Sequence, residues 1–532
     1  MSTAASTPSF LRLALTLSSC VLALSACKGD SAADGEGSET MATAGTMGDG
    51  DGDDPSGDGD PSGDGDPSGD GDGEPGCDEP GCPCSGDTCG TGLACIEGMC
   101  QETVCGDGEV QGDEECEDGN AIDGDGCDND CTLTRVAQVH AGMHHSCALI
   151  DGGAIVCWGR GELGQLGYGN DQHVGDDELP SDVGSVALPG PVIKLDLGGH
   201  HSCAILQDGG LRCWGLNDRG QLGNGTINNI GDDESLANLP PVSVPPAIDI
   251  EAGERHTCAR VGNGEVRCWG LNEQGQLGYA NTFDIVPVNE MLLPGEAVSL
   301  GPVTSRLAIG FWHSCVNFVD GGVRCWGRND NGQLGQGHLA NIGDDEAPSS
   351  VGLVQIIPPA LPANTEVVSV ALGGNHGCAL LGGGELMCWG ANGSGQLGYG
   401  DLNNVGDDDV PSSRVPVDIG GPAVQVTCGA NHTCARRDDG EVLCWGDNSV
   451  GQLGYGNTDN VGDDELPVLA GPVQLGGVAT QLSAGGNHTC ALLEGGDVRC
   501  WGQNNFSQLG LGSSVTVGDN ETPAEVNPVS IF

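Results

Sequence analysis

Seven histidines and fourteen cysteines recur in one fixed arrangement. Of all the side chains in this sequence, these are the best suited to metal binding or catalysis. Each copy reads His-x-Cys, then nine residues, then Cys-Trp-Gly. Imidazole and thiolate groups serve as metal ligands and as acid–base or nucleophilic catalysts. A catalytic or metal-binding histidine has no reason to recur in every copy, so the repetition favours a structural role. The histidines are His145, His201, His256, His313, His376, His432 and His488.

The two cysteines of each copy are predicted to form a disulfide bond across a hairpin. In the first copy, apolar runs flank the turn Asp151-Gly152-Gly153, and folding about this turn sets Cys147 opposite Cys157. Directly opposed residues in a non-hydrogen-bonded pair lie within disulfide range. The expected pairs are Cys147–Cys157, Cys203–Cys213, Cys258–Cys268, Cys315–Cys325, Cys378–Cys388, Cys434–Cys444 and Cys490–Cys500.

The elements around each hairpin predict an all-β, seven-bladed propeller over residues 133–532. Both faces of the hairpin are apolar, so neighbouring units must cover both. A glycine-rich turn, an acidic loop and a Pro-x-x-Val segment follow, which indicates about four short strands per unit. The repeat region starts without a Pro-x-x-Val segment and ends with one at 522–532. We therefore expect the C-terminal segment to complete the first blade.

The motif His-Ser-Cys-Ala-Leu, with Cys-Trp-Gly and Gly-Gln-Leu-Gly after it, resembles the repeat of the regulator of chromosome condensation family. The resemblance implies a seven-bladed propeller and covers roughly 133–532. The regular cysteines depart from the family pattern, as expected of an exported variant. A secreted bacterial propeller of this superfamily inhibits β-lactamases by docking one face over the enzyme. The resemblance therefore implies that a propeller of this kind can capture another protein. The Gly-Trp-Arg-His-Thr motif of the related ultraviolet-B photoreceptors is absent.

The N-terminal region is expected to direct export and anchoring. Residues 1–26 combine Arg12 with a short apolar run, as in a signal peptide, and the following Cys27 resembles the lipidated cysteine of bacterial lipoproteins. An ordinary secretory signal is the alternative. Residues 27–76 form an acidic, Gly/Asp/Pro/Ser-rich segment that we expect to be a disordered tether. A lipid on Cys27 would be the only membrane anchor, at the cell envelope or outside the cell.

Residues 77–132 are predicted to be small disulfide-rich modules, because ten cysteines accompany almost no apolar core. The second half resembles a cysteine-rich repeat of myxobacterial surface proteins, and its cysteines are expected to form disulfides of undefined connectivity. A zinc site is the less favoured alternative. The disulfide candidates are Cys105, Cys116, Cys127 and Cys131, and the candidate calcium ligands are Asp118, Asn120, Asp123 and Asp125. The remaining propeller cysteine, Cys428, is expected to be a buried, inert thiol.

Six of the seven repeats carry an acidic loop such as Val-Gly-Asp-Asp-Glu, and the third repeat lacks it. The simplest interpretation is a tight turn whose carboxylates accept backbone hydrogen bonds. The functional alternative is a ring of carboxylates that binds calcium or basic partners. We expect the protein to need no cofactor, with calcium as the alternative.

Departures from the repeat indicate where a ligand binds. Phe311-Trp312 replaces the small or polar pair that precedes the other histidines, and the longest spacing between repeats lies close by. Aromatic side chains are favoured binding anchors. We expect a ligand surface around Phe311, Trp312 and residues 281–298, with local repacking as the alternative.

These patterns favour a monomeric, non-catalytic, surface-anchored binding propeller with a protein or glycan ligand. The net charge is −60 with only 17 Lys plus Arg, which argues against a nucleic-acid surface. No nucleophile elbow, P-loop or dinucleotide motif is present. The alternatives are a propeller hydrolase or lyase with a site at the central channel, and an exchange factor for a small GTPase.

Overall fold

The computed structural model describes residues 93–96, 99–102, 115–116, 127, 132–285 and 296–532. Within these ranges, no helix is both long and apolar enough to cross a bilayer. Several predicted sites lie outside the described residues: the signal peptide, Cys27, the tether, Cys105, Cys131, and the calcium candidates Asp118, Asn120, Asp123 and Asp125.

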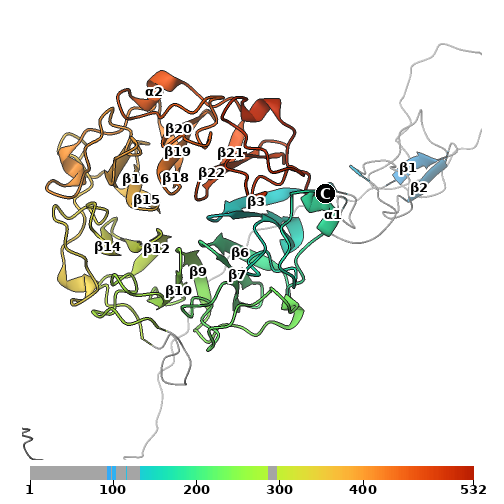
Figure 1. Cartoon of the computed structure of the whole chain (residues 1–532), viewed down its shortest axis with the longest axis horizontal. Coiled ribbons are helices and arrows are strands. Elements are labelled where there is room, and N and C mark those ends of the chain that lie inside the picture. Colours follow the sequence, from blue (N-terminus) through green and yellow to red (C-terminus); the bar gives the residue numbers. More distant parts are fainter. Residues whose placement is uncertain (1–92, 97–98, 103–114, 117–126, 128–131, 286–295) are drawn as a thin grey trace, which may run out of the picture. The chain divides into compact units, whose positions relative to one another are not determined.

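Seven antiparallel sheets surround a central channel, which confirms the predicted seven-bladed propeller (Figure 1). The first strand of each blade lies innermost, and the second and third form the disulfide-bonded hairpin. Blades one to four are β3 (Val136–Ala141), β4 (His145–Ile150), β5 (Ile155–Gly159); β6 (Val192–Leu197), β7 (His201–Leu206), β8 (Leu211–Gly215); β9 (Ala247–Ala252), β10 (His256–Val261), β11 (Val266–Gly270); and β12 (Thr304–Ile309), β13 (His313–Phe318), β14 (Val323–Gly327). Blades five to seven are β15 (Val367–Leu372), β16 (His376–Leu381), β17 (Leu386–Gly390); β18 (Ala423–Cys428), β19 (His432–Arg437), β20 (Val442–Gly446); and β21 (Ala479–Ala484), β22 (His488–Leu493), β23 (Val498–Gly502).

Each blade has three strands, so the expectation of about four was wrong. The fourth segment is reduced to isolated contacts: a bridge from Gly159 to Val174 and a hydrogen bond from Val186 N to Ile155 O (2.9 Å) in blade one. This outer segment contains proline, which has no N–H to extend a ladder. It forms single helical turns instead. These are α1 (Pro180–Val183), α2 (Pro467–Ala470), and the 3₁₀ turns η2 (Leu236–Asn238), η3 (Pro348–Ser350), η4 (Pro411–Ser413) and η5 (Pro523–Glu525), with η1 (Asp151–Gly153) in the first hairpin.

The predicted closure of the ring by strand exchange was also wrong. Val529 N donates to Val498 O (2.8 Å), so the C-terminal segment lies on blade seven rather than blade one. The Pro-x-x-Val segment ends a unit instead of beginning one, and each blade is therefore one continuous stretch of chain. The ring closes through contacts between neighbours, such as Ser181 N to Ser530 O (3.0 Å).

All seven hairpin disulfides are present, with Cα–Cα distances of 4.0–4.1 Å at directly opposed positions. The bonded cysteines are buried in the blade cores. In the cysteine-rich module, β1 (Leu93–Ile96) pairs with β2 (Met99–Glu102), and Cys116 is bonded to Cys127. Cys428 is a free, buried thiol, and its burial raises the pKa to about 12.

Candidate functional site

The recurring histidines connect neighbouring blades. We call the contact between two consecutive blades a joint. At six of the seven joints, the histidine Nε2 lies 2.8–3.2 Å from a serine or threonine hydroxyl of the next blade. His488 and Ser146 make the same contact where blade seven meets blade one (2.9 Å). The histidines thus hold the ring together, through a side-chain partner that sequence reasoning missed.

The hydrogen-bond pattern defines the state of these histidines. The Ser202 hydroxyl donates to Gln165 O (2.9 Å), so its only proton is used and His145 Nε2 must donate to the hydroxyl. Burial lowers the pKa of the equivalent His201 to about 3, which keeps the ring neutral. A fully buried, neutral imidazole in every joint is a structural group.

The joint between blades four and five lacks this bond. His-Gly-Cys replaces His-Ser-Cys or His-Thr-Cys at the start of β16, so Gly377 offers no hydroxyl to His313. Neither ring nitrogen of the fully buried His313 has a hydrogen-bond partner among the described residues. Leu372 fills the space, with Cδ2 2.6 Å from the position of a Cβ on Gly377. The irregular motif is visible in the sequence, but its partner in another repeat is not.

A ring of backbone hydrogen bonds surrounds one mouth of the channel, where each innermost strand turns into the hairpin. It runs from blade to blade and closes with Gly486 N donating to Gly142 O (3.2 Å). Phe311 takes part in this ring: its N–H donates to Gly373 O (3.2 Å), and its carbonyl accepts from Glu254 N (3.3 Å).

The structure places Phe311 and Trp312 together, partly exposed, at this mouth. Phe311 also lines the channel. The third part of the predicted surface, 281–298, is described only at its two ends, 281–285 and 296–298.

A second aromatic group lies where blades seven and one meet, and sequence reasoning missed it. The Arg160 guanidinium lies 4.8 Å from the centre of the Phe506 ring, and the His144 ring lies 4.9 Å from it. Arg160 also pairs with Glu162 (2.5 Å). The contributing residues come from different repeats, so only the fold brings them together.

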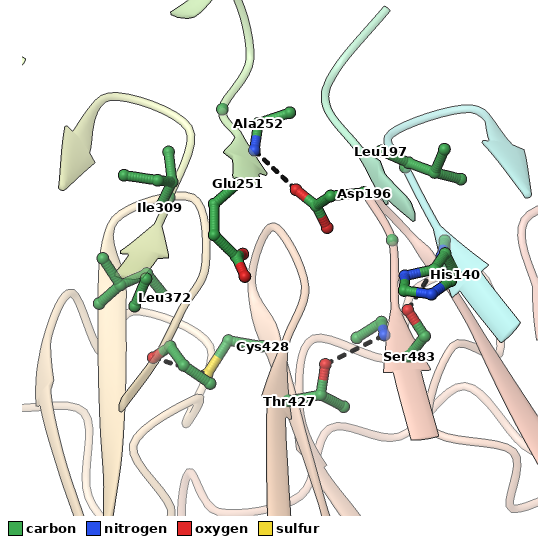
Figure 2. Close-up of a pocket in the computed structure, with 18 of the residues that line it drawn as sticks. His140, Asp196, Leu197, Glu251, Ala252, Ile309, Leu372, Thr427, Cys428 and Ser483 are labelled. Carbon is green, nitrogen blue, oxygen red and sulfur yellow. Dashed lines mark hydrogen bonds between the residues drawn. The ribbon is translucent and has the colours of Figure 1, made fainter. Parts of the chain in front are cut away.

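The channel contains a cavity of about 400 Å³ lined by the innermost strands (Figure 2). The neighbouring strands β6 and β9 present the carboxyl groups of Asp196 and Glu251, and the strands that follow, β12, β15 and β18, present Ile309, Leu372 and Cys428. Asp196 accepts a hydrogen bond from Ala252 N (2.6 Å). Sequence reasoning missed these carboxyl groups, although acidic residues within the apolar strands Val-Ile-Lys-Leu-Asp-Leu and Ala-Ile-Asp-Ile-Glu-Ala were a usable signal.

The carboxyl groups of the channel are held in an environment that disfavours their charge. Burial, and then the neighbouring Asp196 charge, raises the pKa of Glu251 well above its usual range. Burial also raises the pKa of Asp196 to about 7. Lys194 offsets part of this effect through ion pairs with Asp249 and with Glu251 (3.5 Å).

The acidic loops act as turns in at least two blades. Glu234 accepts from Gly231 N (3.1 Å), and Asp409 accepts from Gly406 N (2.8 Å). In five loops, three carboxylates lie within 4.8 Å of one another. The backbone bonds agree with the turn interpretation, and calcium binding stays a prediction.

Comparisons with known proteins agree with this geometry. Residues 232–531 match the RCC1-like domain model, and residues 153–205 and 192–221 match models of the regulator of chromosome condensation repeat. Residues 87–132 match a domain of unknown function, DUF4215, which partly supports the cysteine-rich repeat.

Similar proteins cover most of the chain. The ultraviolet-B receptor UVR8 of Arabidopsis thaliana is 30% identical over 404 residues, which is 75% of this chain and 83% of that protein. The mitochondrial RCC1 domain-containing protein RUG3 of the same plant is 30% identical over 400 residues, 70% of this chain and 82% of that protein. The solved structure of yeast RCC1 (Prp20) bound to Kap60 shares the fold, with a TM-score of 0.54, 19% identity, and coverage of 79% of this chain and 91% of that chain. The chain therefore belongs to the RCC1-like family of repeat propellers.

Proposed function

We propose that this protein is an exported, surface-anchored, non-catalytic propeller that captures a protein partner at the channel mouth around Phe311 and Trp312. Relatives support an interaction role, since yeast Prp20p binds Gsp1p and histones. A protein partner is the general feature taken from them. The strongly negative charge of this chain argues against a nucleic-acid surface, which also favours a protein partner.

The observation that carries the proposal is the aromatic pair at the mouth. Phe311 and Trp312 stand where blades five to seven carry Gly374-Asn375, Ala430-Asn431 and Gly486-Asn487. Both aromatic side chains are partly exposed, although large apolar groups are normally buried. Partly exposed aromatic residues beside polar groups are typical anchors of protein interfaces.

Export is supported by the cysteines. Seven buried disulfides brace the seven blades, and such bonds persist in oxidising compartments. Together with the signal-like N-terminus and the lipoprotein-like Cys27, this favours a location at the cell surface. A surface glycan is the alternative ligand, since aromatic rings also contact sugars.

The test is a capture experiment with the oxidised full-length protein. Immobilised protein is exposed to cell-surface and culture-supernatant proteins and to glycans, with and without a calcium chelator. We expect saturable capture of a protein that the double variant Phe311→Ala/Trp312→Ala loses with an unchanged melting temperature. The matched control, Asn431→Ala/Asn487→Ala, alters the same mouth on regular blades and should retain capture. A large loss of stability in the aromatic variant would show instead that the pair is core.

The channel carboxyl groups favour one second candidate, a hydrolase or lyase acting outside the cytoplasm. A carboxyl group with a raised pKa is suited to general acid catalysis. Turnover in a substrate screen that disappears in Glu251→Gln, without any capture by the mouth, would make the enzyme the leading interpretation.

A further inference from the structure

We propose that the central channel is a binding site for an organic cation, a guanidinium or primary ammonium group on a short alkyl chain. The cavity of about 400 Å³ has one wall with carboxyl groups and one apolar wall. Asp196 and Glu251 form the first, and Ile309 and Leu372, from the next two innermost strands around the channel, form the second (Figure 2). A cation with a hydrocarbon chain matches both walls.

In the part of the chain that the structure describes, Glu251 lacks the bond to the next strand that three of its six counterparts on the other innermost strands make, one of which is Asp196. Thr427 accepts from Ala484 N (3.1 Å) in the next blade, and Ser483 accepts from Ala141 N (2.9 Å). These short side chains satisfy the edge of the neighbouring strand, as an exposed strand edge requires. Glu251 makes no such bond within the described residues, and its longer side chain reaches into the cavity instead.

The carboxyl group of Glu251 therefore has bonding capacity left for a ligand. Its only ion-pair partner is Lys194, at 3.5 Å, among the residues that the structure describes. Lys194 also pairs with Asp249, so its charge is shared. The side chain of Glu251 is 28% exposed, and this exposure faces the cavity.

Once Glu251 is ionised, the charges around it leave a deficit of positive charge. Lys194 and Asp196 approach from β6, Asp249 from β9, and Arg260 from β10, where it pairs with Asp249 (3.5 Å). Three acids thus face two bases. His140 on β3 adds no charge, because burial and then Lys194 lower its pKa to about 4. The Cys428 thiol on β18 stays protonated.

An organic cation supplies the missing charge better than calcium does. Calcium takes six to eight oxygen ligands, whereas one oxygen of Asp196 is already occupied by Ala252 N and Lys194 lies beside the site. An ammonium or guanidinium group needs fewer acceptors, and its alkyl chain buries apolar wall surface.

The channel also has a direction. Arg306 lines it on β12, two residues before Ala308, and repels cations at that depth. At the other end lie Phe311 and Met143. An aromatic face attracts a cation, so we infer entry through the mouth that carries Phe311.

The test is calorimetric titration of the full-length protein with agmatine, which carries both cationic groups on a butyl chain. Removing a charge-assisted hydrogen bond costs about 1.5–3 kcal/mol, so Glu251→Gln should weaken binding about tenfold or more. The matched control Glu265→Gln changes an acid of the same blade that lies outside the cavity, where it pairs with Arg267, and should bind normally. Asp196→Asn keeps an acceptor for Ala252 N and should weaken binding while leaving the fold intact.

Binding should also release a proton. Burial raises the pKa of Glu251 above its usual range in the empty channel, and a cation stabilises the ionised form, so binding favours the loss of a proton. The observed enthalpy should therefore depend on the ionisation enthalpy of the buffer for the wild type, and not for Glu251→Gln. Agmatine binding that is absent at millimolar concentration, or unchanged in Glu251→Gln, would overturn the proposal.

A second experiment distinguishes two sources of the cation, a free metabolite and a basic side chain of the captured protein. If the cation is a free metabolite, the Phe311→Ala/Trp312→Ala variant should bind agmatine as tightly as the wild type does. A lysine or arginine side chain of the captured protein predicts that excess agmatine displaces that protein and that Glu251→Gln weakens its capture. Agmatine binding without any protein capture would uphold the channel site and reject the proposed mouth surface.

Discussion

The joint between blades six and seven and the joint between blades four and five differ in almost every side-chain bond that links two blades. In the first, His432 contacts Thr489 (2.9 Å), Gln425 bonds both backbone groups of Leu482, and Thr427 accepts from Ala484 N. In the second, within the described residues, His313 has no hydrogen-bond partner, and Ala308 stands where Thr427 stands in blade six. The buried side-chain amide of Asn317 is also unpaired in this part of the structure.

The weaker joint keeps the backbone ring, the tryptophan contact and a side-chain bond from Gln333 Nε2 to Asn375 Oδ1 (3.4 Å). Phe311 N still donates to Gly373 O (3.2 Å), and Trp389 Nε1 still donates to Gln333 O (2.9 Å). The repeat therefore keeps the fold at this joint while most of its reinforcing bonds are lost. Because Phe311 and Trp312 lie directly over it, the least reinforced joint coincides with the proposed binding surface.

The largest expected effect is acid destabilisation of the histidine joints. Burial lowers the pKa to about 3 for His201 and about 4 for His432, against 6.5 when unfolded. A group with a depressed folded pKa contributes stability above its unfolded pKa and loses it as pH falls. Each such histidine should cost about 1.4 kcal/mol per pH unit between pH 6.5 and 4. Melting temperature measured from pH 7 to 4 should therefore fall. The raised pKa values of carboxyl groups such as Glu251, Asp196 and Glu178 act in the opposite direction and offset part of this loss.

Converting the strong joint into the weak one should have the next largest effect. Thr489→Gly removes the hydroxyl that accepts from His432 Nε2 and donates to Gln452 O. Leaving buried polar groups unsatisfied costs about 1–3 kcal/mol, and chemical denaturation should show a loss of this size. Thr489→Ser keeps the hydroxyl and should lose much less. Equal losses in the two variants would mean that the histidine bond contributes little.

The reverse conversion should stabilise the weak joint by a smaller amount. Gly377→Ser supplies a hydroxyl to His313 Nε2 and to Gln333 O, while Leu372 must turn aside. We expect a gain of about 1 kcal/mol in the free energy of unfolding. The control Gly377→Ala brings the same steric demand without the hydroxyl and should give no gain. If Gly377→Ala were also more stable than the wild type, the gain would come from the lower backbone entropy of the unfolded chain and not from the hydroxyl group.

The two joints also show how far sequence reasoning reaches. The blade count, the disulfides such as Cys147–Cys157 and the burial of Cys428 follow from patterns within one repeat, and all were predictable. Three features depend on which repeat lies beside which: the partner of His432, the position of the C-terminal segment on blade seven, and the proximity of Asp196 to Glu251. Only the folded ring brings these residues together, so spacing along the chain does not reveal them.

The most direct test of the proposed binding surface is hydrogen–deuterium exchange of the full-length protein with and without the captured partner. We predict protection of amides at 310–312 and 373–375, over the weak joint, and unchanged exchange at 429–431 and 485–487 over the strong one. Protection confined to the regular blades, with 310–312 unaffected, would contradict the claim that the irregular joint carries the binding surface.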